Sequence, residues 1–367
     1  MRIPHFNLAA AAGELHDELL SRWEGLLART SFVGGPEVEA FESAFAAFLG
    51  SPGCVGVANG TDALVLALRA LDLQPGDEVL VPAMTFFATA EAVVWAGGVP
   101  VVVDVEDGTL NLDARAAAAA AGGRTVGVIG VHLYGQPCDL DAIGELCRRR
   151  GWWLVEDAAQ AHGATWKGKR VGSNGALAGW SFYPSKNLGC FGDGGAVTGG
   201  DAQALARARL LANHGRIQHY EHGAVGTNSR LDALQAAVLN LRLPLLERDN
   251  ERRRALAARY REGLAGIGGV RLLDVAPGAE PVYHQLVVRT TERDRLRQHL
   301  LDRQIGSAVF YPIPLHRQPA LLPLLGAVEA PVAERAAAEV LALPLYPQLT
   351  TAQVDEVCAE VRAFFGG

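Results

Sequence analysis

Short apolar runs alternate with helix-like segments between about residue 53 and residue 200. The runs CVGVA, EVLVP, VPVVVD, VGVIGV and WWLVED are brief, valine-rich and bounded by Gly, Pro or Asp, which is typical of buried strands. Between them, TDALVLALRAL, FFATAEAVVWAG and DLDAIGELCRRRG repeat their apolar positions near the helical period. This alternation predicts an α/β fold with a mainly parallel sheet between helices. The strand ends and the loops after them should share one ligand-binding edge.

The pattern changes after about residue 240. A long charged helix is predicted over 245–266, a strand over PVYHQLVVR, a helix over ERDRLRQHLLDRQ and a strand over AVFYP, followed by two more helices. We therefore predict three parts. Residues 1–30 form an N-terminal segment, residues 31–240 a large α/β domain, and residues 241–367 a connecting helix with a small C-terminal α+β domain.

Composition and charge exclude several classes of protein. Hydrophobic residues make up 49% of the chain and charged residues 20%, as in ordinary globular enzymes. The net charge of -7 argues against a nucleic-acid surface, and no apolar run is long enough to span a membrane. The five cysteines are scattered, without the spacing of a zinc site or a disulfide framework. The N-terminus lacks the features of a signal peptide, so a cytoplasmic protein without a metal is expected.

Lysine is rare in this chain, and one lysine stands out. Lys167 and Lys169 lie together in WKGKR, which predicts an exposed turn, whereas Lys186 follows the apolar run AGWSFYP at a predicted strand end. Burial there would lower the pKa of the amine and produce a neutral nucleophile able to form a Schiff base. Arginine stays charged and cannot replace it. Taken alone, the position is also compatible with an ordinary surface lysine after a turn.

Three neighbouring motifs favour the functional interpretation of Lys186. In VANGTDAL a strand runs through Asn59-Gly60-Thr61 into a helix, which is a geometry that can bind an anion. Asp157 ends a very apolar strand and needs a cationic partner, and Phe86 in PAMTFF could stack on a flat ring. Each feature has a structural alternative, namely a helix cap, a capping acid or a core aromatic. Together they are the parts that a pyridoxal-phosphate enzyme requires.

The chain resembles the sugar aminotransferases of the DegT/DnrJ/EryC1/StrS family, within the fold-type I pyridoxal-phosphate enzymes. The match runs nearly end to end, and it is carried by the motifs FVGGPEVEAFE, NGTDAL, PAMTFFATAEAV, EDAAQAHGA, SFYPSKNLG, GDGGAV and GTNSRLDALQAA. The resemblance implies that Lys186 is the catalytic lysine bound covalently to the cofactor and that Asp157 pairs with the pyridinium nitrogen. It further implies that Gln160 bonds the phenolic oxygen, that Phe86 stacks on the ring, and that Gly60, Thr61 and Ser181 hold the phosphate.

The same resemblance implies a homodimer with shared active sites, in which Asn228 reaches the phosphate of the neighbouring subunit's cofactor. The expected reaction is transamination of a nucleotide-linked keto-sugar with L-glutamate as amino donor, in amino-sugar biosynthesis. Lysine at position 186 favours transamination over the dehydration that family members with histidine there perform. Possible substrate contacts are Tyr183, His214, Tyr311 and His316, although a structural role is an open alternative for each histidine.

The motif YPIPLHRQPA resembles members that act on dTDP-3-keto-6-deoxyhexoses. Those members usually have histidine before the tyrosine, where this chain has Phe310. An aminotransferase for a 4-keto sugar nucleotide or a keto-cyclitol is therefore an alternative. A non-catalytic regulator of the same fold is a second, but such a protein would be expected to lose the lysine or the phosphate loop.

Overall fold

The structure is a computed structural model that describes residues 1–366, so that Gly367, the last residue of the predicted C-terminal domain, lies outside the described residues. The α-helices are α1 (Leu8–Gly13), α2 (His16–Arg29), α3 (Pro36–Leu49), α4 (Gly60–Ala70), α5 (Ala88–Trp95), α6 (Ala114–Ala120), α7 (Leu140–Arg150), α8 (Ala202–Ala212), α9 (Ala233–Arg242), α10 (Leu246–Gly263), α11 (Arg293–Asp302), α12 (Pro331–Glu339) and α13 (Thr351–Phe364). Single 3-10 turns cover Leu133–Gly135, Leu243–Leu245 and Leu315–Arg317.

The strands are β1 (Val55–Val57), β2 (Glu78–Pro82), β3 (Val99–Val103), β4 (Thr125–Val131), β5 (Trp153–Asp157), β6 (Thr165–Trp166), β7 (Lys169–Arg170), β8 (Leu177–Ser181), β9 (Gly195–Thr198), β10 (Arg216–Gln218), β11 (Glu221–His222), β12 (Arg271–Leu272), β13 (Ala279–Glu280), β14 (Leu286–Arg289) and β15 (Val340–Leu343). The central sheet has seven strands in the order β1-β9-β8-β5-β4-β2-β3. β9 runs antiparallel to β1 and β8, whereas the other pairs are parallel. The predicted α/β class is confirmed.

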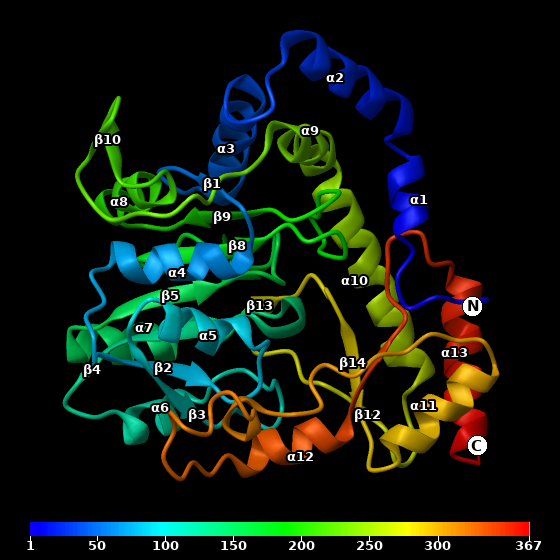
Figure 1. Ribbon diagram of the computed structural model, residues 1–367. Coiled ribbons are helices and arrows are strands. Elements are labelled where there is room, and N and C mark those ends of the chain that lie inside the picture. Colours follow the sequence, from blue (N-terminus) through cyan, green and yellow to red (C-terminus); the bar gives the residue numbers. More distant parts are fainter. Residues whose placement is uncertain (367) are drawn as a thin grey trace.

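Helices cover both faces of this sheet (Figure 1). Alternate residues of β2 point to opposite faces, because successive side chains of a strand do so. Val79 and Val81 pack in a core with α4, α5 and α8, while Leu80 packs in another with α3, α7 and α9. A sheet buried on both sides requires the continuous apolar strands seen in the sequence. The loops after β1, β2, β5 and β8 all leave the sheet at one edge.

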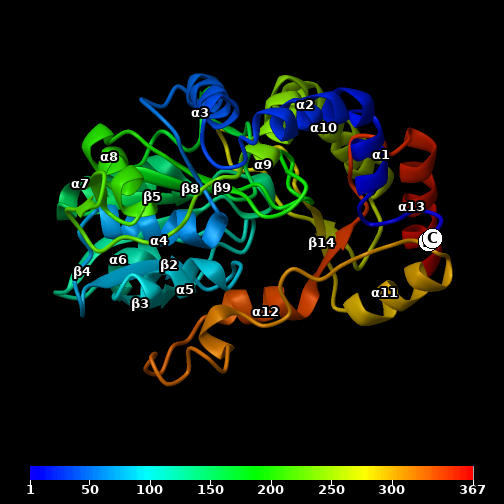
Figure 2. The same ribbon diagram turned by 45° about the horizontal axis from the view of Figure 1, so that its top comes forward.

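A smaller unit follows α9. The helix α10 leads to a three-stranded sheet of order β12-β14-β15, which packs against α10, α11 and α13 around a third core. Figures 1 and 2 show this unit beside the large sheet, with both chain ends near α13. The domain limits at residues 30 and 240 stay a prediction.

The structure corrects two predicted elements here. In the predicted strand AVFYP, only Ala308 forms an isolated bridge, with Ala342, and the segment continues as irregular chain toward the large sheet. PVYHQLVVR is a strand only over its last four residues. The reason in both cases is tertiary, because Tyr311 and His284 face the cavity described below instead of extending a sheet.

No helix within residues 1–366 combines the length and apolar character needed to cross a membrane. In the same part of the chain, no group of three or more His, Cys, Asp or Glu side chains is arranged to hold a metal ion.

Candidate active site

A cavity of about 770 Å³ opens at the edge of the sheet where β1, β2, β5 and β8 end. Its lining includes nine of the residues that the sequence predicts for the site: Gly60, Thr61, Phe86, Asp157, Gln160, Ser181, Tyr183, Lys186 and Tyr311. These residues come from four loops and from the segment before α12, and they are up to 251 positions apart in the chain, from Gly60 to Tyr311. The volume lies in the range of cavities that bind a cofactor and a small molecule.

The loop after β8 holds Lys186 at its tip. The backbone N–H of Cys190 donates to the Phe182 carbonyl at 2.7 Å and closes this loop, while the Lys186 N–H donates to the Tyr183 carbonyl at 2.8 Å. The next residue, Asn187, is buried and donates through Nδ2 to Asn250 Oδ1 at 2.9 Å and to the Val282 carbonyl at 3.0 Å. The lysine therefore projects from a rigid support.

The amine of Lys186 and the carboxyl of Asp157 face the same buried space. Burial lowers the pKa of Lys186 to about 8, although the negative charge of Asp157 acts in the opposite direction. Burial likewise raises the pKa of the Asp157 carboxyl, and the hydrogen bond from Thr89 and the charge of Lys186 partly counter this. Thr89 Oγ1 donates to Asp157 Oδ2 at 2.8 Å. The site thus combines an amine that loses its proton readily with a buried carboxyl group that would be stabilised by a cation.

The start of α4 forms one end of the cavity. Gly60 and Thr61 are the first two helical residues, so their backbone N–H groups have no acceptor in the helix itself. The Asn59 side chain caps the helix by accepting from the Asp62 N–H at 2.8 Å. A Cβ added at Gly60 would lie 2.7 Å from the Ser181 Cβ. Glycine is therefore needed for this close approach between α4 and the end of β8.

Gln160 links the sheet to the segment before α12. Its Oε1 accepts from the Tyr134 N–H at 2.6 Å, and its Nε2 donates to the Tyr311 hydroxyl at 3.1 Å. Burial raises the pKa of the Tyr311 phenol, which keeps it neutral. The Phe86 ring lies 5.8 Å from the Tyr311 ring, centroid to centroid, and is 55% exposed. An exposed aromatic face at the mouth of a cavity is available for stacking on a flat ring.

Three predicted site residues lie outside this cavity. Asn228 and His214 are exposed on the segment around the β10–β11 hairpin, where Asn213 and Asn228 form an isolated bridge. His316 is buried, and its Nε2 lies 2.9 Å from Glu334 Oε1 on α12. His162, two residues after Gln160, is buried against the Trp180 and Phe182 rings.

Sequence reasoning missed Thr89, His284 and Phe6. Thr89 supports Asp157, while His284 and Phe6 line the cavity. The available signal for the first was a pair of threonines four residues apart, Thr85 in the loop after β2 and Thr89 in α5, whose hydroxyls lie 2.9 Å apart. His284 and Phe6 come from the small unit and the N-terminal segment, and no local pattern indicates their position.

Glu156 precedes Asp157 in β5, and its side chain points to the opposite face of the sheet, where it bonds the loop at 172–175. Its carboxylate accepts from the backbone N–H groups of Gly172, Asn174 and Gly175 at 2.7–2.8 Å. His132 Nε2 donates to it at 3.0 Å, since His132 Nδ1 accepts from the Cys138 N–H. Burial opposes ionisation, yet the bonds from His132 and the backbone hold the pKa of Glu156 below its usual value.

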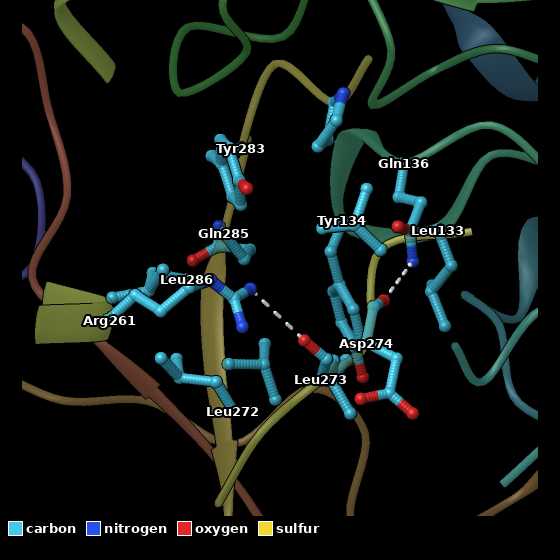
Figure 3. Close-up of a pocket in the computed structure, with 13 residues that line it drawn as sticks. Leu133, Tyr134, Gln136, Arg261, Leu272, Leu273, Asp274, Tyr283, Gln285 and Leu286 are labelled. Atoms are coloured by element: carbon cyan, nitrogen blue, oxygen red, sulfur yellow. Dashed lines mark hydrogen bonds between the residues drawn. The ribbon is translucent and has the colours of Figure 1, made fainter. Parts of the chain in front are cut away.

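A second, much smaller cavity lies behind Tyr134, between the large sheet and the small unit (Figure 3). Gln136 Nε2 donates to the Asp274 carbonyl at 3.0 Å on one side, and Arg261 Nη2 donates to the Leu273 carbonyl at 3.3 Å on the other. Its volume of about 30 Å³ leaves room only for water-sized groups. The large cavity, which is lined by Lys186 and Asp157, is the candidate active site.

Residues 14–362 match the model of the DegT/DnrJ/EryC1/StrS aminotransferase family. The chain is 47% identical over 364 residues to the dTDP-3-amino-3,4,6-trideoxy-alpha-D-glucose transaminase of Streptomyces venezuelae, covering 98% of this chain and 96% of that protein. It is 44% identical to the erythromycin biosynthesis sensory transduction protein EryC1 of Saccharopolyspora erythraea, covering 99% and 100%. The crystal structure of S. venezuelae DesV in complex with a ketimine intermediate superposes with a TM-score of 0.97 at 46% identity, covering 100% of this chain and 99% of that one.

Proposed function

Because the chain belongs to the DegT/DnrJ/EryC1/StrS aminotransferase family, we propose that it transfers an amino group from L-glutamate to a nucleotide-linked keto-sugar. The chain is an aminotransferase, and its relatives act on sugars. The proposed substrate is a dTDP-3-keto-6-deoxyhexose, since the relative from S. venezuelae is a transaminase named for a dTDP-3-amino sugar. The observation that carries the proposal is Lys186, whose lowered pKa and position opposite buried Asp157 suit amine transfer.

The described residues fit pyridoxal phosphate as the cofactor. The start of α4 and Ser181 form a narrow cradle of backbone and hydroxyl donors, which suits a phosphate. Asp157 is a buried acid in the same cavity as Lys186, which suits a protonated ring nitrogen. Phe86 would stack on the ring, and Gln160 would bond its phenolic oxygen. When bound, the cofactor supplies the electron sink that stabilises a carbanion.

Lys186 is the proposed acid and base of the reaction. Its Nζ would remove a proton from the α-carbon of L-glutamate, which leaves as 2-oxoglutarate, and would later deliver a proton to the sugar carbon that gains the amine. A pKa of about 8 keeps a useful fraction of the amine unprotonated near neutral pH. Asp157, supported by Thr89, would keep the ring nitrogen protonated. Tyr183 and Tyr311 at the cavity wall are the proposed sugar contacts, with His214 and His316 as more distant candidates.

We further propose a homodimer in which Asn228 reaches the phosphate of the partner's cofactor. In support, Asn228 lies on the exposed segment next to the β10–β11 hairpin. Three large apolar side chains are also exposed there, namely Ile217, Tyr220 and Val225. Large apolar side chains exposed close together in the sequence favour an interaction surface there.

The half-reaction with L-glutamate tests the proposal. The purified protein loaded with pyridoxal phosphate should lose the visible absorption of the bound cofactor on adding L-glutamate and release 2-oxoglutarate. Lys186→Ala and Lys186→Arg should lose turnover by about 10³-fold or more. Lys169→Ala, a change at an exposed position of β7, is the matched control and should behave like the wild type. Amination by either Lys186 variant would overturn the assignment.

Enzymes similar to this chain that act on 3-keto sugars usually have histidine at the position of Phe310. A 4-keto sugar nucleotide is therefore the second candidate substrate. The Phe310 carbonyl accepts from the Tyr134 hydroxyl, and its ring lines the cavity. Amination of 3-keto and 4-keto sugar nucleotides, followed by mass spectrometry of the products, distinguishes the two. A clear preference for the 4-keto sugar nucleotide would replace the proposed substrate while leaving the aminotransferase activity intact.

A further inference from the structure

A small cavity of about 30 Å³ adjoins the large one on the far side of Lys186. Phe6, Ser185 and Lys186 line both cavities, so the two share a wall. The rest of the small cavity includes two arginines, Arg242 from α9 and Arg253 from α10. Its size suits a carboxylate or a water molecule rather than a whole substrate.

Arg253 is a buried cation without an acidic partner in contact. Its side chain is only 5% exposed. Its Nη1 donates to the carbonyls of Tyr283 and Leu345 at 3.2 and 3.0 Å, but its Nε has no hydrogen-bond partner among residues 1–366. Burial lowers the pKa of Arg253 to about 10, so it is charged at neutral pH. A buried guanidinium with a free N–H group is stabilised when an anion enters the space beside it.

The other charged groups around this cavity leave it positive. Arg242 Nη1 donates to the Gly189 carbonyl at 2.7 Å. Asp249 is the facing acid, and its Oδ1 already accepts from Arg248 Nε and Nη2 at 2.9 and 2.8 Å. Arg242, Arg253 and Lys186 thus outnumber the one carboxylate.

The large cavity has the opposite character. Among the described residues, no arginine lines it, and four acids do: Asp62, Glu91, Asp157 and Asp193. An amino acid reacting at Lys186 has its α-carboxylate attached to the reacting carbon, so that group must stay in the large cavity. A second carboxylate at the end of the side chain finds no guanidinium in that lining, whereas the small cavity offers two.

We infer that Arg253 and Arg242 bind the side-chain carboxylate of a dicarboxylic amino donor in the small cavity. The inference rests on the proposed function and makes these arginines the residues that select a dicarboxylic donor over a neutral amino acid. Phe6 and Ser185, on the shared wall, border the path along which the donor side chain passes from one cavity to the other.

Binding of a donor-like probe tests the site without any reaction. Glutarate has both carboxylates but no amine, and butyrate has one carboxylate. In isothermal titration calorimetry with the full chain, glutarate should bind at least about tenfold more tightly than butyrate, and Arg253→Gln should weaken glutarate about tenfold or more. Arg259→Gln is the matched control, because this arginine lies on the same helix but is exposed and bonded to Asp355. Equal affinity of the wild type for the two probes would overturn the inference.

Donor kinetics give the second readout. In the cofactor-loaded protein, Arg253→Gln should raise KM for L-glutamate about tenfold while changing that for L-alanine by less than about twofold. A folded Arg253→Gln protein with an unchanged preference for L-glutamate over L-alanine contradicts the inference but leaves the proposed function standing. A wild type that reacts with neither amino acid contradicts the proposed function, and the glutarate titration still decides the carboxylate site.

Arg253 also joins α10 to two carbonyls, so its replacement could prevent folding. In that event Asp249→Asn provides the test, since it removes the facing negative charge. Glutarate should then bind about threefold more tightly or better, and an unchanged or weaker affinity would refute the carboxylate site.

Discussion

At the residue scale, the position of Lys186 explains why this chain has lysine there. Arginine occupies nearly every other basic position, and the remaining lysines, Lys167 and Lys169, are exposed. The loop after β8 places Lys186 where burial lowers its pKa to about 8. An arginine in the same place would stay charged and could not act as nucleophile or base. The proposed reaction therefore requires a buried amine at this position, and burying that amine lowers the stability of the folded chain.

Replacing Lys186 by methionine should stabilise the cofactor-free protein. Because the folded-state pKa is lower than that of the unfolded chain, folding penalises the charged amine below pH 8, and the penalty disappears as the pH rises from about 8 to 10.5. Lys186→Met removes it, so the free energy of unfolding at pH 7 should rise by roughly 1–3 kcal/mol. Urea denaturation at pH 7 and pH 10 measures this.

The increase in the free energy of unfolding that Lys186→Met produces should be smaller at pH 10 than at pH 7. Lys169→Met, at an exposed position, is the control and should change stability little at either pH. A Lys186→Met protein that is less stable than the wild type at pH 7 would show that the amine is not strained by burial.

At the element scale, the end of β5 serves two purposes. Neighbouring residues of a strand point to opposite faces, so Asp157 faces the cavity while Glu156 faces the loop at 172–175. Three backbone N–H groups and His132 bond Glu156, which anchors that loop and the strand that carries Asp157. The backbone N–H of His132 also donates to the backbone carbonyl of Asp157 at 3.1 Å. The acid of the site is thus held by a buried hydrogen-bond network.

Glu156→Gln should weaken this network. The amide keeps the size of the side chain but presents N–H groups to backbone N–H donors, leaving buried groups unpaired. The free energy of unfolding should fall by about 2–4 kcal/mol. Glu145→Gln, which changes a half-buried surface acid bonded to Arg148 and Arg149, should cost less than about 1 kcal/mol. Equal, small effects of both variants in chemical denaturation would contradict the structural role of Glu156.

At the scale of the whole molecule, the cavity of one chain does not include Asn228 or His214, which the sequence predicts for the site. Both lie on the segment around the exposed β10–β11 hairpin, outside the cavity of their own chain. If the proposed dimer forms, the two residues can complete the site of the partner. Light scattering of the purified protein should then give twice the mass of the 38.8 kDa chain.

Hybrid dimers test whether the sites are shared. Lys186→Ala and Asn228→Asp should each be inactive, the second because a carboxylate repels the phosphate. Co-expression of the two variants should restore about a quarter of wild-type activity, since half of the dimers are hybrids and each hybrid has one intact site. Restoration would fail if Asn228 serves its own subunit, and full activity of Asn228→Asp alone would remove it from the site.

The amino-acid sequence by itself determined the α/β class, the strands of the central sheet except β9, and the residues at the ends of β1, β2, β5 and β8. It did so because burial on both faces demands continuous apolar strands, and because turns, caps and buried charges leave local signals. Lys186 and Asp157 could be recognised in this way, each from its own apolar surroundings. The division into domains at residues 30 and 240 stays a prediction.

Only the tertiary structure decided which distant residues meet. Thr89 bonds Asp157 across 68 positions, Gln160 bonds Tyr311 across 151, and Arg253 lies beside the cavity wall that includes Lys186 and Phe6. The segment 308–312 has the apolar composition of a strand, yet it lines the cavity because Tyr311 finds its partner in the large sheet. Periodicity reports which face of an element is buried, but the partner on that face depends on the packing of the whole chain.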